Sequence, residues 1–305
     1  MGEYSLPRQG RAAKKTSWRR TVATQAALCL ALYGAFAVGR LQKPPGHGRR
    51  ETLDLHFLSV AGLPRHPQLQ TQLLLQMDKA AKIFKAKFVL NIGELEEDDP
   101  FWHNATMYFR FLRIPWYTIT VSQRQRYGNF VKRIALPHEQ VLELIGIDTG
   151  SLQGFMHADN QSKISNEQVQ WLQETLELSD SNWRIVVGFD PLMICDEEHT
   201  TERAKFYEPL HSLFIRHGVN AYLSTRGCVG YFYHDGTIMH IGNPTPSDKR
   251  RGAFLANKNV NNTSEVSNGF LVHRVTPLEI GSYLIDSEGR VALKSVVQQN
   301  GRGVM

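Results

Sequence analysis

The sequence is poor in cysteine, and its histidines are scattered. Its 305 residues include three cysteines and 12 histidines. No two of them stand in a Cys-x-x-Cys or His-x-x-x-His spacing, the patterns that place two metal ligands side by side. Scattered histidines are more often surface or satisfied core residues; here they include His103, His157, His199, His211, His217, His234 and His240. We therefore expect no metal site that is encoded by local spacing.

Acidic residues are nearly absent from the N-terminus. Glu3 is the single acid before residue 21, where six basic residues lie: Arg8, Arg11, Lys14, Lys15, Arg19 and Arg20. This tail supplies most of the net charge of +6, and the remainder of the chain is near neutral. The sequence has no aromatic–basic interleaving and no nucleic-acid motif, so we expect no nucleic acid as a partner.

Charge is also absent from residues 21–39, where Gln25 is the only strongly polar residue. About 20 apolar residues span a bilayer, and basic residues on the N-terminal flank place that side in the cytosol. We predict a cytosolic tail (1–20), a single-pass transmembrane signal-anchor (21–39), a linker (40–52) and a domain that is lumenal in the secretory pathway or extracellular. Two alternatives are a signal peptide cleaved at Ala35-Phe36-Ala37, which would give a secreted protein, and an organellar transit peptide.

Four Asn-x-Ser/Thr sequons support a lumenal domain, because this pattern is glycosylated in the secretory pathway. They lie in polar stretches that look like loops. The sequence therefore predicts glycosylation at Asn104, Asn160, Asn261 and Asn262.

Hydrophobic periodicity predicts a mixed α/β organisation. Apolar runs predict strands at 53–60, 87–92 and 142–148. Helical spacing predicts a helix over 68–84 that faces inward with Leu69, Leu73, Met77, Ala80, Ala81 and Phe84. A second helix is expected from Ser165, with Gln168 at the capping-box position, and a third over 202–216. From Gly230 onward the pattern predicts hairpins, the first with a turn at 234–236.

Several segments, taken in order, resemble one family. They are Trp183-Arg184-Ile185-Val186-Val187-Gly188-Phe189-Asp190-Pro191, Gln170-Trp171-Leu172, Gly218-Val219-Asn220-Ala221-Tyr222-Leu223 and Gly269-Phe270-Leu271-Val272. Over residues 53–297 the chain resembles the calcineurin-like metallophosphoesterases, in particular purple acid phosphatases of the tartrate-resistant type, and residues 298–305 form a C-terminal tail. The resemblance implies a four-layer αββα sandwich, in which helices flank two packed mixed sheets.

The resemblance also implies that the metal ligands of the family are lost. It places other residue types at the ligand positions: Gly62, Glu94, Glu97, Ser122, Phe189, Arg226 and Cys228. A two-metal hydrolase needs convergent ligands that hold two cations about 3.5–4 Å apart. Phenylalanine cannot coordinate a metal, and only Glu94 keeps a hard oxygen ligand. We therefore expect no cofactor where the family binds a dinuclear Fe, Zn or Mn centre.

The general acid of the family is replaced as well. Its position is Gln123, and an amide cannot transfer a proton near neutral pH, so we expect no catalytic residue. As a replacement for the metal charge, we expect Arg124 or Arg226 to pair with Glu94 or Glu97. The family places the strands before Cys195 and Cys228 side by side, which leaves a disulfide and two separate thiols as alternatives.

Three functions fit these features. The first is a membrane-anchored, catalytically degenerate pseudophosphatase that binds a protein or a phosphorylated or glycan ligand. The second is a residual metal-dependent acid phosphatase with a rebuilt site, which would use Glu94 with Asp148 or Asp190. The third is a purely structural lumenal domain. The loss of ligands favours the first, although fold alone does not choose among them.

Overall fold

The computed structural model describes residues 18, 22–30, 54–93, 100–119, 129–149, 163–193, 207–225, 227, 230–246, 266 and 268–299. The chain divides into two compact units, residues 1–51 and 52–305. In the first unit, residues 22–30 are helical, and Cys29 is an exposed free thiol. None of the helices in the described ranges is both long enough and apolar enough to cross a membrane. Residues 31–39 of the expected anchor lie outside those ranges.

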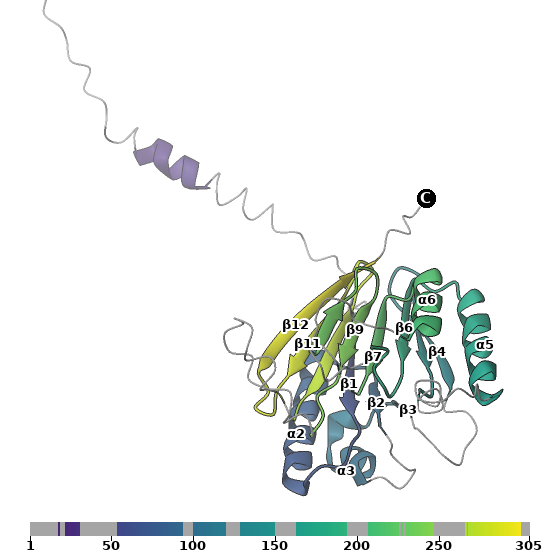
Figure 1. The fold of residues 1–305 in the computed structure, drawn as a ribbon. Coiled ribbons are helices and arrows are strands. Elements are labelled where there is room, and N and C mark those ends of the chain that lie inside the picture. The colour runs from purple at the N-terminus through teal and green to yellow at the C-terminus, as the bar shows by residue number, and fades with distance from the viewer. Residues whose placement is uncertain are drawn as a thin grey trace, which may run out of the picture. The chain divides into compact units, whose positions relative to one another are not determined.

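The second unit contains two six-stranded sheets, shown in Figure 1. The first has the strand order β12-β11-β10-β1-β2-β3. Its strands are β1 Leu55–Ala61, β2 Val89–Ile92, β3 Trp116–Ile119, β10 Phe270–Val275, β11 Glu279–Ile285 and β12 Val291–Gln298. β1, β2 and β3 are parallel, whereas β10, β11 and β12 pair antiparallel.

The second sheet has the order β4-β5-β6-β7-β9-β8. Its strands are β4 Phe130–Ala135, β5 Val141–Gly146, β6 Trp183–Val187, β7 Ala221–Ser224, β8 Phe232–His234 and β9 Met239–Gly242. The four central strands are parallel, and β4 and β8 close the two edges antiparallel. Both sheets are therefore mixed.

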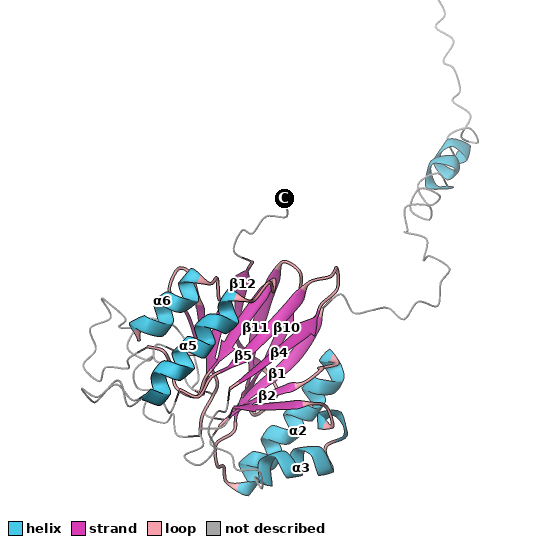
Figure 2. Ribbon diagram, turned by 90° about the vertical axis from the view of Figure 1, so that its right-hand side faces the viewer, coloured by secondary structure: helices cyan, strands magenta, loops and turns pink. Residues whose placement is uncertain are grey.

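Successive side chains of a strand point to opposite faces of its sheet. Each sheet can therefore pack against the other sheet with one face and against helices with the other. In β1, Leu55 and Phe57 belong to the core between the sheets, and Leu58 and Val60 belong to the core beneath the helices. The first sheet is covered on its outer face by α2 (Pro67–Phe84), α3 (Pro100–Tyr108) and η1 (Arg110–Leu112); the second is covered by α5 (Lys163–Glu177) and α6 (Glu208–Arg216). Figure 2 shows α2 and α3 on one side of the strands and α5 and α6 on the other. This arrangement confirms the αββα sandwich.

The helix α2 is confirmed, but part of its predicted inward face is wrong. Leu73, Met77, Ala80 and Ala81 are buried, together with Leu74, whereas Leu69 and Phe84 are exposed. The two exceptions lie in the first and last turns, so the apolar stripe that packs on the sheet covers only the middle of the helix.

The start of α5 also differs from the prediction. The helix begins at Lys163 and not at Ser165. Gln168 is therefore well inside the helix, where it is buried and donates a hydrogen bond from Nε2 to Asn129 Oδ1 at 2.9 Å. The side chain of Gln168 therefore makes a tertiary hydrogen bond, and not the capping-box bond that the sequence pattern predicted.

Candidate functional site

The carboxyl ends of the parallel strands form one edge of each sheet. Ala61, Ile92 and Ile119 are paired neighbours in the first sheet, and Val187 and Leu223 are paired neighbours in the second. In open α/β sheets, ligands bind outside this edge. The expected ligand positions follow these strands, and we call the residues directly after β1, β2, β5, β6 and β7 the carboxyl edge.

The first predicted ligand position is Gly62, which has no side chain. Gly62 is buried directly after β1, and its N–H donates to Ile92 O at 2.8 Å. A Cβ added to Gly93, the residue after β2, would lie 2.3 Å from the Gly62 carbonyl oxygen. The two loops therefore touch through their backbones, and a side chain on Gly93 would force them apart.

The predicted ligand position after β6 is Phe189, whose backbone is held by hydrogen bonds. Phe189 is partly exposed, and its carbonyl accepts hydrogen bonds from Thr225 N at 3.0 Å and from Thr225 Oγ1 at 2.7 Å. The next residue is held as well: Asp190 N donates to Thr149 Oγ1 at 2.8 Å, and Tyr222 Oη donates to Asp190 O at 2.5 Å. The scaffold of this segment is thus intact around a side chain that cannot bind a cation.

An arginine that the sequence did not single out folds back onto the end of β1. The Nη1 of Arg65 donates to Ala61 O at 2.7 Å and to Leu63 O at 3.0 Å, and its Nε donates to Asn268 Oδ1 at 3.2 Å. Its guanidinium lies 5.8 Å from the Phe101 ring centroid. Burial lowers the pKa of Arg65 to about 10, so the group stays charged at neutral pH. A positive charge therefore lies beside the first predicted ligand position, Gly62.

A chain of buried hydrogen bonds crosses between the sheets and ends at the carboxyl edge. His273 lies between Ser282 and Ser59, with Nδ1 to Ser282 Oγ at 2.8 Å and Nε2 to Ser59 Oγ at 2.8 Å. Ser59 Oγ donates to Asn243 Oδ1 at 2.8 Å, and Asn243 Nδ2 donates to Ser224 O at 2.9 Å. Since the Ser59 proton goes to Asn243, His273 donates from Nε2 and accepts from Ser282 at Nδ1. Burial lowers the pKa of His273 to about 3, so the ring is neutral.

A pocket lies at the carboxyl edge of the second sheet. The segment after β6 contributes Leu192 and Met193, and β7 contributes Tyr222 and Ser224. The hairpin strands add Tyr233 and His240, among others. The lining is mainly apolar with a few polar groups, and the cavity volume of about 10 Å³ is close to that needed for one water molecule. Among the described residues, the lining includes no lysine or arginine, the side chains that most often bind phosphate.

Most of the expected site residues lie outside the described ranges. This holds for Glu94, Glu97, Ser122, Gln123, Arg124, Cys195, Arg226 and Cys228, and for the sequon residues Asn160, Asn261 and Asn262. Of the predicted ligand positions, the structure describes Gly62 and Phe189. Asp148 and Asp190 follow β5 and β6 but do not join a group of three metal-binding side chains within the described ranges.

The remaining sequon is not in the loop that the sequence predicted. Asn104 lies in α3, where Ala105 is fully buried and Thr106 Oγ1 donates to Trp102 O at 3.0 Å. Phe101 and Ala105 face the core at helical spacing, and this packing folds the polar stretch into a helix.

No protein-family model and no curated protein sequence matches the chain. Several solved structures are similar to it. GAP50, described as the anchor in the inner membrane complex of Plasmodium, is similar with a TM-score of 0.60 and 17% identity over 81% of this chain and 89% of that one. PhoD is similar with a TM-score of 0.46 and 11% identity, covering 81% of this chain and 70% of that one. A predicted phosphoesterase from Streptococcus pneumoniae has a TM-score of 0.36 and 9% identity, covering 80% of this chain and 98% of that one.

Identity at these levels establishes the fold and does not transfer a function. The strand order, the two mixed sheets and the flanking helices agree with the architecture that the motifs predicted. The chain therefore has the fold of the calcineurin-like metallophosphoesterases.

Proposed function

We propose that this protein is a membrane-anchored, catalytically degenerate relative of the purple acid phosphatases that acts by binding a partner. The observation that carries the proposal is Phe189, an apolar side chain at a ligand position whose backbone is held by hydrogen bonds from Thr225. A backbone that is held in place around a side chain unable to bind metal fits a domain that acts by binding and not by hydrolysis.

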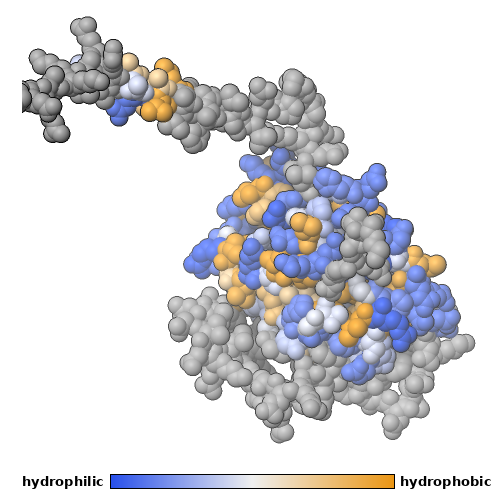
Figure 3. Space-filling model, turned by 90° about the horizontal axis from the view of Figure 1, so that it is seen from above, coloured by the Kyte–Doolittle hydropathy of each residue, from blue (hydrophilic) through white to orange (hydrophobic). Residues whose placement is uncertain are grey.

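The site of binding that we propose is the pocket at the carboxyl edge. The cavity itself is small, about 10 Å³, so we propose that the partner contacts its partly exposed rim at Pro191, Gly230 and Tyr233. The face seen in Figure 3 carries hydrophobic and hydrophilic residues side by side. Single exposed apolar residues are ordinary on protein surfaces, so we assign the partner to the pocket. The description of GAP50 as an anchor supports a role in attachment for this chain.

The anchor itself is part of the proposal. Residues 1–20 would form the cytosolic tail, 21–39 the transmembrane signal-anchor and 40–52 the linker, so that residues 53–297 are lumenal or extracellular. The absence of charge from 21–39 and the basic flank support this topology. Glycosylation at Asn160, Asn261 and Asn262 would follow from it.

The third part of the proposal is that an arginine side chain supplies the positive charge that metal ions supply in the family. Arg124 or Arg226 would neutralise Glu94 or Glu97, and Arg65 adds a further candidate, because its buried Nη2 has no hydrogen-bond partner among the described residues. A double-mutant cycle between Arg65→Met and Glu94→Gln tests one pair. A coupling energy above about 0.5 kcal/mol supports the pairing, and a coupling near zero contradicts it.

The test of the degenerate site is metal content and turnover. The full-length protein is purified in detergent without a histidine tag, and iron, zinc and manganese are measured together with phosphomonoester hydrolysis from pH 4 to 8. We expect fewer than two metal ions per chain and turnover far below the roughly 1–10³ s⁻¹ of ordinary enzymes. Two ions per chain with turnover in that range would exclude the proposal.

A further inference from the structure

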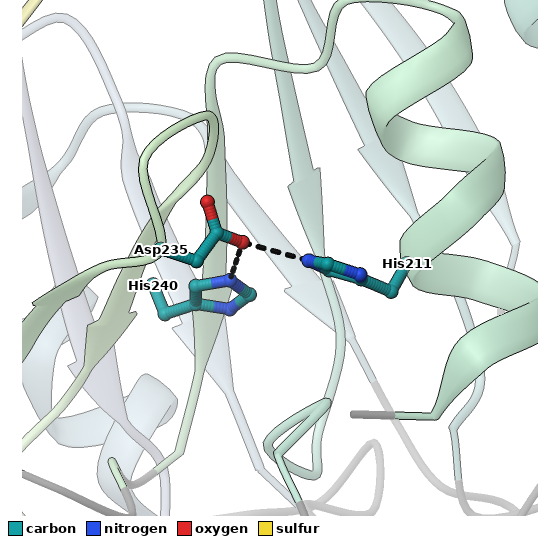
Figure 4. Close-up of side chains that lie close together, drawn as sticks. All are labelled: His211, Asp235 and His240. Atoms are coloured by element: carbon teal, nitrogen blue, oxygen red, sulfur yellow. Dashed lines mark hydrogen bonds and ion pairs between the residues drawn. The ribbon is translucent and has the colours of Figure 1, made fainter. Parts of the chain in front are cut away.

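Three polar side chains converge on the outer face of the second sheet, as Figure 4 shows. His211 lies on α6, Asp235 begins the turn between β8 and β9, and His240 is on β9. Asp235 Oδ2 lies 2.7 Å from His211 Nε2 and 3.0 Å from His240 Nε2. Their side chains are only 13% (His211), 6% (Asp235) and 9% (His240) exposed. Within the described ranges, these residues form the group of His, Cys, Asp and Glu side chains that is close enough to share an ion.

The fold positions each of the three side chains separately. In β9, Met239 and Ile241 point into the core between the sheets, so the alternation of the strand turns His240 to the outer face. On α6, Leu210 and Phe214 are buried against that same face, and His211 lies beside them. The convergence is therefore a product of packing and not of sequence spacing.

The carboxylate is oriented by its own turn. Asp235 Oδ1 accepts hydrogen bonds from Thr237 N and Ile238 N, each at 2.7 Å. These bonds leave Oδ2 facing the two rings. Burial opposes ionisation of Asp235, but the bonds from Ile238 N, from the two histidines and from Thr237 N outweigh it and lower the pKa of its carboxyl. The group is therefore an anion at neutral pH.

Because the Asp235 carboxylate accepts from both rings, each Nε2 carries a proton in this arrangement and must lose it before it can bind a metal. A neutral imidazole can offer the lone pair of one ring nitrogen to a cation. Two imidazole nitrogens and one carboxylate oxygen are a ligand set that zinc accepts, with a fourth position left for water or another ligand.

We propose that His211 Nε2, Asp235 Oδ2 and His240 Nε2 bind one Zn²⁺ ion. Bonds of about 2.0–2.2 Å in tetrahedral geometry would separate the ligand atoms by about 3.4 Å. The present separations from Oδ2 are 2.7 and 3.0 Å, so each Nε2 must move away from Oδ2 by less than an ångström. On binding, each Nε2 releases its proton to solvent or shifts it to Nδ1, and the ion takes the place of the two hydrogen bonds.

This site is separate from the lost dinuclear centre. Its ligands come from α6, β9 and the β8–β9 turn, whereas the positions of the lost centre follow β1, β2 and β6. Since His240 also lines the pocket, an ion here would connect the pocket wall to α6 and fix the hairpin. The inference goes beyond the proposed function, which includes no cofactor.

The experiment is a zinc titration of the full-length protein, purified in detergent without a histidine tag and stripped of metal with a chelator. Isothermal calorimetry at pH 7.5 gives the stoichiometry and Kd, and Co²⁺ substitution gives visible absorption bands that report the coordination number. The variants are His211→Gln and His240→Gln, because glutamine can keep a hydrogen bond to Asp235 but is a poor zinc ligand. His103→Gln, which changes an exposed histidine on α3, is the matched control.

We expect one ion per chain for the wild type and for His103→Gln, with a micromolar Kd or tighter. Each ligand variant should bind at least 100-fold more weakly and lose the tetrahedral Co²⁺ bands. Equal affinity in the wild type and His211→Gln, or no binding by the wild type up to 1 mM Zn²⁺, would overturn the inference. A dinuclear centre at the carboxyl edge would instead give two ions per chain that His211→Gln leaves in place, which separates this result from failure of the proposed function.

Discussion

The buried histidine between the sheets should make the stability of the fold depend on pH. His273 is fully buried and neutral, and burial lowers its pKa from 6.5 to about 3. Because the folded pKa lies below the unfolded one, the unfolded chain binds the proton more tightly. The stability contributed by the neutral ring is therefore complete above pH 6.5 and is lost progressively as the pH falls from 6.5 towards 3.

The size of the effect follows from the two pKa values. Between pH 7.5 and 5.5, the unfolded histidine becomes mostly protonated while the folded one does not. For an unfolded pKa of about 6.5, this lowers the free energy of unfolding by about 1.4 kcal/mol. His273→Gln removes the titrating group. The difference in the free energy of unfolding between the wild type and this variant should therefore fall by about 1.4 kcal/mol from pH 7.5 to pH 5.5.

The assay is urea unfolding of the full-length protein, followed by tryptophan fluorescence at pH 7.5, 6.5 and 5.5. Trp183 is fully buried, so its emission should report the loss of the core. His56 and His240, whose pKa values are also lowered by burial, are present in both proteins, and their contributions cancel in the comparison. His103→Gln serves as the control with an exposed histidine. If wild type and His273→Gln respond equally to pH, His273 is not a buried neutral residue and the hydrogen-bond chain is wrong.

Three further predictions concern the hydrogen bonds of Ser59, the close contact at Gly93 and the topology of the N-terminus. Ser59→Ala should lower the free energy of unfolding by about 2–4 kcal/mol, since it removes two buried hydrogen bonds and leaves both partners unsatisfied; the exposed Ser212→Ala should change it by less than about 0.5 kcal/mol in the same urea titration. Gly93→Val should cost about 1–3 kcal/mol or more, because the new side chain meets the rigid backbone of Gly62; a thermal unfolding midpoint equal to that of the wild type would rule out this close contact. In intact microsomes, protease should remove residues 1–20 and spare the domain, and glycosidase should lower its apparent mass; a protected tail would reverse the predicted topology.

Local chemistry in the sequence predicted individual strands and helices, and the resemblance to a known family implied how they assemble. Apolar runs of four to seven residues mark β1, β2 and β5, and helical spacing marks α2, because burial of one face is encoded in consecutive residues. The order of the scaffold segments gave the resemblance that implied the sandwich, and the same resemblance predicts that Phe189 stands where the family has a metal ligand. The topology of the N-terminus and the arginine replacement stay predictions, since residues 31–39, Arg124 and Arg226 lie outside the described ranges.

Only the tertiary structure brought the remaining groups together. His211 and His240 are 29 residues apart and share no motif spacing, yet α6 and β9 place both rings against Asp235. Ser59 and His273 are separated by 214 residues, and Ser59 and Asn243 by 184, so no local pattern could reveal their hydrogen bonds. Gln168 and Asn104 were misplaced for the related reason that packing decides where a helix begins and which polar stretch becomes helical. Sequence patterns encode which face of an element is buried, whereas the contacts between elements depend on how the two sheets and their helices pack.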